Sequence, residues 1–109
     1  MRFLMMFKPE QPGQDCADQA EMEEFVTRSY ESGELLATGG LFAAPTRVHR
    51  RHERYTVTDG PYAETKEVIA GFALMELASH DAAVESVHRF LAIAGDGTCE
   101  IHAIADGPQ

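Results

Sequence analysis

Two stretches of the chain carry apolar residues on both sides of a predicted strand, where a half-buried strand would alternate apolar and polar residues. The first covers residues 2–8, and the second covers residues 68–77. In the first, one side carries Phe3, Met5 and Phe7, and the other carries Leu4 and Met6. A strand that is apolar on both sides must be covered on both sides, so we expect these two strands at the centre of a sheet.

Two further segments carry apolar residues at the spacing of an amphipathic helix. The first begins at the capping pair Asp18 and Glu21 and stops at Gly33; its apolar stripe consists of Met22, Phe25, Val26 and Tyr30. The second begins at Ser79 or at His80-Asp81 and ends at Gly95 and Gly97; its stripe consists of Ala83, Val84, Val87, Phe90, Leu91 and Ala94. Both patterns are typical of helices that cover a sheet.

Shorter strand patterns fill the remaining chain. Residues 34–42 contain Gly39-Gly40, a pair that marks a bulge or a close backbone approach. Residues 47–51 and 53–58 form a hairpin or a bent strand, and we expect Tyr55 and Val57 to point inward. In the last strand, residues 98–105, Cys99 and Ile101 point inward and His102 points to the other side.

The order strand, helix, strands, helix, strand predicts one α+β domain over residues 1–109, with a ferredoxin-like antiparallel sheet and two helices on one face. Two helices cover only one side of the two-sided strands. We therefore expect a homodimer in which a second copy covers the other side, leaving a ligand cavity beside the sheet.

Charge and composition narrow the function classes. The formal charge is −9, which argues against nucleic-acid binding by the whole surface. Four of the nine basic residues nevertheless lie in residues 47–54. This cluster is either a solvated strand pair that meets acidic residues or an anion-attracting rim beside a pocket. We expect Cys16 and Cys99 to be free thiols, and we expect a cytoplasmic protein without membrane spans.

The densest group of candidate side chains is the polar turn at residues 59–67. Asp59 is either a general base, if a pocket desolvates it, or a turn residue whose carboxylate accepts backbone hydrogen bonds. Gly60 and Pro61 shape the turn under both interpretations. Tyr62 either lines a pocket or packs. Arg47 and Arg54 are secondary ligand-binding candidates.

His102 is the most interesting histidine, since its side of the last strand borders the expected dimer cavity. His49 and His52 point to opposite sides of a strand and make a poor metal pair. We therefore expect neither a metal nor a cofactor. The sequence contains no serine or cysteine nucleophile in an elbow motif.

The segment Asp59-Gly60-Pro61-Tyr62-Ala63-Glu64-Thr65-Lys66-Glu67, followed by Ala70-Gly71-Phe72, closely resembles the signature of DGPF-domain proteins in the YCII-related superfamily. The resemblance implies a dimeric α+β barrel. The wider superfamily is proposed to use a His and Asp pair, but the first helix here has no histidine, and Met22 lies near that place. Tyr62 replaces the phenylalanine of the signature.

The expected function is the binding of a small organic ligand, aromatic or anionic, in a sheet-side pocket. If the protein is an enzyme, cofactor-independent proton transfer, isomerisation or elimination suits such a pocket, with Asp59 and His102 as the catalytic candidates. The resemblance implies a different alternative, because some relatives are encoded beside extracytoplasmic-function sigma factors. That alternative is a regulatory module with a sigma factor as its partner.

Overall fold

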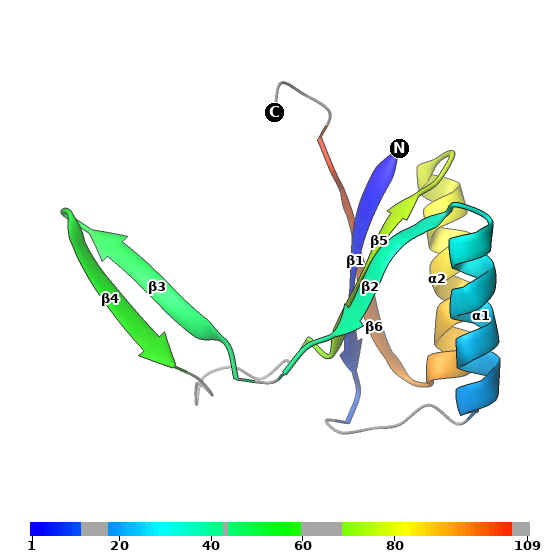
Figure 1. Ribbon diagram of the computed structural model, residues 1–109, viewed down its shortest axis with the longest axis horizontal. Helices are drawn as coiled ribbons and strands as arrows, with labels where there is room; N and C mark the ends of the chain where they lie inside the picture. Colours follow the sequence, from blue (N-terminus) through cyan, green and yellow to red (C-terminus); the bar gives the residue numbers. More distant parts are fainter. Residues whose placement is uncertain (12–17, 43, 60–68, 106–109) are drawn as a thin grey trace.

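The computed structural model describes residues 1–11, 18–42, 44–59 and 69–105, which form two sheets and two helices (Figure 1). The elements in chain order are β1 (Arg2–Pro9), α1 (Gln19–Glu31), β2 (Leu35–Gly40), β3 (Thr46–Arg51), β4 (Arg54–Asp59), β5 (Gly71–Glu76), α2 (His80–Ala94) and β6 (Gly97–Ala103).

The main sheet has the strand order β2-β5-β1-β6, and its neighbouring strands are antiparallel. Both helices lie on one face of this sheet (Figure 1). The arrangement is the ferredoxin-like α+β fold. The two strands with apolar residues on both sides, β1 and β5, are the central pair, which confirms that prediction. The strand predicted over residues 68–77 is shorter than expected, because β5 begins at Gly71.

The predicted helix ends are confirmed by their caps. The Asp18 carboxylate accepts a hydrogen bond from the Glu21 backbone N–H at 3.0 Å, and the Ser79 hydroxyl accepts one from the Ala82 N–H at 3.1 Å. Gly33 and Gly95 follow the helices with φ of 82° and 102°, values that favour glycine. Within the described part of the chain, no helix combines the length and the apolar character needed to cross a membrane.

The core lies between the helices and the sheet. Phe3 and Met5 of β1 pair with Met75 and Ala73 of β5, and this side of the sheet faces the helices. Val87 of α2 closes the cluster. Tyr30 does not belong to it: the prediction that Tyr30 is part of the buried stripe is wrong, because its side chain is 45% exposed at the end of α1.

The other side of the sheet, here called the rear face, is also apolar at its centre. Its central members are Leu4 and Met6 of β1, which pair with Leu74 and Phe72 of β5. These four residues are half-buried. The helices leave this face uncovered because both lie on the opposite side (Figure 1).

Strands β3 and β4 form a separate two-stranded hairpin that projects from the main sheet on the side away from the helices (Figure 1). Of the two predicted arrangements, a hairpin or a bent strand, the structure shows the hairpin. The predicted inward orientation of Tyr55 and Val57 is wrong for the single chain, because these side chains are 69% and 66% exposed. The reason is that this hairpin is a sheet of its own with no helix packed on it.

Candidate functional site

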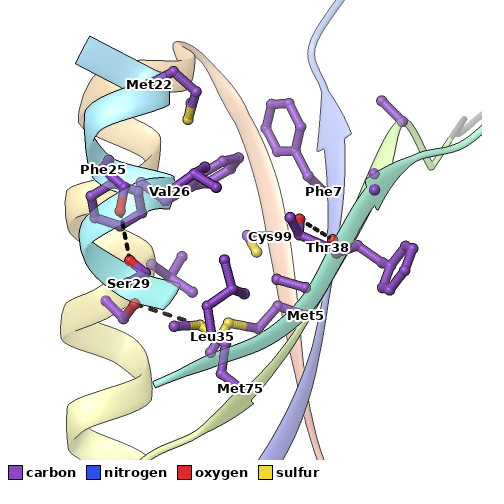
Figure 2. Close-up of a pocket in the computed structure, with 18 residues that line it drawn as sticks. Met5, Phe7, Met22, Phe25, Val26, Ser29, Leu35, Thr38, Met75 and Cys99 are labelled. Carbon is purple, nitrogen blue, oxygen red and sulfur yellow. Dashed lines mark hydrogen bonds between the residues drawn. The ribbon is translucent and has the colours of Figure 1, made fainter. Parts of the chain in front are cut away.

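A cavity of about 270 Å³ lies between the two helices and the main sheet (Figure 2). Both helices and the strands β1, β2 and β5 contribute large apolar side chains to its wall. They include Met5 and Phe7 from β1, Met22, Phe25 and Val26 from α1, Leu35 from β2, Met75 from β5, and Val87 and Phe90 from α2. The rings of Phe7 and Phe90 meet edge to face, with centroids 5.2 Å apart.

Small residues on the sheet leave the space open. Gly71 and Ala73 of β5 and Gly39 of β2 line the cavity. A Cβ added at Gly71 would lie 3.1 Å from the Gly39 carbonyl oxygen, and one added at Gly39 would lie 3.1 Å from the Phe72 ring. Of the Gly39-Gly40 pair, Gly39 therefore lies in close contact with β5, whereas a Cβ at Gly40 would lie at an ordinary 3.7 Å from the Ala70 carbonyl oxygen. The irregularity in β2 lies elsewhere, between Leu35 and Ala37.

Among the described residues of this lining, the polar side chains are three hydroxyl groups and the Cys99 thiol. Ser29 donates a hydrogen bond to the Phe25 carbonyl oxygen at 2.8 Å, and Thr38 donates to the Phe72 carbonyl oxygen at 2.7 Å. Ser86, which is buried, donates weakly to the Met75 sulfur at 3.8 Å (Figure 2). Each hydroxyl already donates its hydrogen to a protein acceptor, so it can only accept a hydrogen bond from a ligand.

Cys99 of β6 brings the single titratable side chain among the described residues that line the cavity. Burial, and secondly the negative charge of Glu100, raise the pKa of the Cys99 thiol above its ordinary value. The sulfur is therefore protonated at neutral pH. A thiol in this state is a weak donor and a poor nucleophile.

The described lining thus contains no carboxylate, imidazole, ammonium or guanidinium group. Such a cavity favours the binding of apolar groups and disfavours the binding of charged groups, because an unpaired charge loses its hydration there. The chemistry that these side chains support is binding, with orientation by two or three hydroxyl oxygens.

Asp59, the principal site residue predicted from the sequence, lies elsewhere. It is the last residue of β4, is exposed, and accepts a hydrogen bond from the Thr46 hydroxyl at 2.7 Å across the base of the hairpin. Arg47 and Arg54 are exposed on the same hairpin, and neither lines the cavity. The predicted pocket residues Gly60, Pro61 and Tyr62 lie outside the described residues.

His102 lies on the rear face, opposite Leu4, as predicted from the alternation of β6. Its side chain is 52% exposed, and its Nε2 lies 3.9 Å from a Glu100 carboxylate oxygen. It is therefore separated from the cavity by the sheet itself. Within the described residues, no group of three or more His, Cys, Asp and Glu side chains is placed to hold a metal ion.

The sequence reasoning missed Ser29, Thr38 and Ser86. A signal for two of them is present: Ser29 and Ser86 occupy positions within the helical apolar stripes, four residues after Phe25 and three after Ala83. A serine at such a position points at whatever the stripe faces. Met22, the residue near the place of the superfamily's histidine, does line the cavity.

Comparison with known proteins identifies a family for this chain. The family model described as the YCII-related domain matches residues 1–106. A search among curated proteins gives no match. The matched range includes all the described helices and strands. The chain belongs to the YCII-related domain family.

Proposed function

We propose that this protein binds a small, uncharged and largely apolar organic molecule in the cavity between its helices and its main sheet. The observation that carries the proposal is the lining: large apolar side chains surround about 270 Å³, and its described members include no charged group. A ligand pocket with an apolar wall and a few polar atoms is the common form of small-molecule sites.

The volume limits the size of the ligand. An apolar cavity of about 150 Å³ accommodates benzene, so a cavity nearly twice as large suits a molecule with about two fused rings. The hydroxyl oxygens of Ser29, Thr38 and Ser86 accept hydrogen bonds, so the ligand gains most from carrying one O–H or N–H donor. An anion is disfavoured, because Arg47 and Arg54 do not line the cavity.

Binding with 1-naphthol tests this proposal, because it is a neutral two-ring molecule with one donor. We expect saturable binding by fluorescence titration, and at least about ten-fold weaker binding of the anion 1-naphthoate, whose carboxylate would be buried without a partner. Ala73→Leu places three extra carbons in the cavity and should weaken 1-naphthol binding by at least about ten-fold.

The matched control is Ala92→Leu, the same change at an exposed position of α2. Equal affinity of Ala73→Leu and Ala92→Leu for 1-naphthol would place the ligand elsewhere, and tighter binding of 1-naphthoate than of 1-naphthol would contradict an uncharged ligand. Melting temperatures of both variants separate lost binding from lost folding, since overpacking destabilises a core.

We also propose that a second copy of the chain covers the rear face, as expected for a dimeric α+β barrel. The support is the apolar centre of that face, Leu4 and Met6 beside Leu74 and Phe72. Acid-base chemistry at Asp59 and His102, the DGPF assignment, the association with a sigma factor and the cytoplasmic location stay predictions.

A further inference from the structure

The β3–β4 hairpin contributes no residue to the described lining of the proposed ligand site. It projects away from the main sheet (Figure 1), and all twelve of its strand residues are exposed. The projection makes the molecule extended: the radius of gyration is 16.0 Å, against about 13 Å for a compact domain of this length.

The two sides of this hairpin differ in chemistry. Val48 pairs with Val57, and the neighbouring pair on the same side is Arg50 with Tyr55. The guanidinium carbon of Arg50 lies 6.0 Å from the centroid of the Tyr55 ring. The valines and Tyr55 are each at least 66% exposed. The opposite side carries Arg47, His49, Arg51, Arg54, Thr56 and Thr58. One side, here called the apolar side, therefore carries the apolar residues of the hairpin together with Arg50 and the Thr46–Asp59 pair at its base, and the other side is basic.

The backbone conformation and the charges at the tip of the hairpin destabilise the hairpin when it is considered alone. His52 and Glu53 both have positive φ, 49° and 65°, in the type of turn that favours Asn-Gly. The adjacent cross-strand pair is Arg51 with Arg54, and like charges in such a pair repel. An isolated two-stranded hairpin is marginally stable in water. Contacts with another surface would compensate for these local costs.

We propose that this hairpin packs on a second copy of the chain, with Val48, Tyr55 and Val57 against the partner's rear face. This inference rests on the proposed pairing of two copies and adds the element that makes the contact. The described part of the chain offers two apolar surfaces on which neither helix packs, the hairpin side and the rear face. The hairpin projects beyond the rear side of its own sheet (Figure 1). Exchange between two copies covers both surfaces at once.

Charge favours the same occupant. Residues 46–59 hold four of the nine basic residues and two of the eighteen acidic residues, so the hairpin carries +2 while the rest of the chain carries −11. A basic hairpin is therefore attracted to the acidic body of another copy. Such complementarity speeds association and sets orientation, and salt weakens it.

The test compares neighbouring residues on the two sides of β4. Sedimentation at micromolar concentration should give wild-type protein at twice 12.0 kDa. Val57→Asn should raise the dimer dissociation constant by at least about ten-fold, because it places an amide in the apolar contact. Thr56→Asn is the matched control on the basic side and should stay dimeric within about three-fold. Circular dichroism confirms that both variants fold.

Three outcomes would overturn the proposal in distinguishable ways. Wild-type protein that stays monomeric removes the pairing itself. A wild-type dimer that Val57→Asn leaves intact shows that the sheet pairs without the hairpin. Monomeric protein that binds duplex DNA with steep salt dependence assigns the arginines to phosphates instead.

A disulfide test keeps the proposal falsifiable if Val57→Asn misfolds. In chains with Cys16→Ser and Cys99→Ala, one sample carries Val57→Cys and another Leu4→Cys. Mild oxidation of the mixture should give a covalent heterodimer, whereas replacing Val57→Cys by Thr56→Cys should not. Equal cross-linking from both hairpin positions contradicts the packing of the apolar side.

Discussion

At the scale of single residues, Cys99 shows how burial decides reactivity. Burial and Glu100 raise the pKa of the Cys99 thiol, so at any pH near neutrality the folded chain holds less thiolate than the unfolded chain. The thiolate is the form that reacts with alkylating reagents. The same shift means that deprotonation above the ordinary thiol pKa favours the unfolded state, so stability falls as the pH rises through this range.

In a Cys16→Ser background, iodoacetamide should therefore alkylate Cys99 at pH 8 at least about ten-fold more slowly in the folded protein than in urea. The rate should keep rising with pH beyond the range in which an ordinary thiol has reached its plateau, because the pKa of Cys99 is raised. Saturating 1-naphthol should slow the reaction further, because Cys99 lines the cavity. Mass spectrometry over time gives the rate. Equal rates in folded and unfolded protein would contradict the buried position.

At the scale of elements, the β3–β4 hairpin is held by weak local preferences. Its base is joined by the Thr46–Asp59 hydrogen bond, but its turn places two residues with side chains at positive φ. His52→Asn combined with Glu53→Gly supplies the residues that this turn favours and should stabilise the hairpin by about 1–2 kcal/mol. Slower amide hydrogen exchange in β3 and β4 would measure the gain.

A control for this prediction is His49→Asn, which places the same side chain within β3, away from the turn. Asparagine is disfavoured in strands, so this variant should not slow the exchange. If the turn variant leaves exchange unchanged, or accelerates it, the positive φ values are not a cost that limits the hairpin.

At the scale of the whole molecule, folding and pairing are coupled if a second copy covers the rear face. Association stabilises the folded state by mass action, so a hundred-fold rise in protein concentration should raise the melting temperature by about 5 °C or more. Scanning calorimetry at two concentrations measures the shift. Val57→Asn should show a smaller shift than Thr56→Asn, and a melting temperature independent of concentration would contradict coupled pairing.

The sequence by itself determined the elements and their order. The apolar patterns of β1 and β5 identified the central strands, and Asp18, Ser79 and the glycines after each helix marked the helix ends. These signals are local, because period and capping depend on residues a few positions apart. The membership of the family likewise follows from the sequence. So does the alternation along β6 that places His102 and Cys99 on different sides of the sheet.

Only the tertiary structure decided where the cavity lies and which residues border it. Its volume depends on how small residues of β2 and β5 face large side chains from the two helices. The periodicity of a single segment does not predict such contacts between distant segments. The position of Asp59 was likewise decided by the tertiary structure. In the sequence it is the first residue of the signature turn, but in the fold its carboxylate accepts a hydrogen bond from Thr46 across the hairpin. Contacts between distant segments set these positions, because register and layer packing decide which side chains share a space.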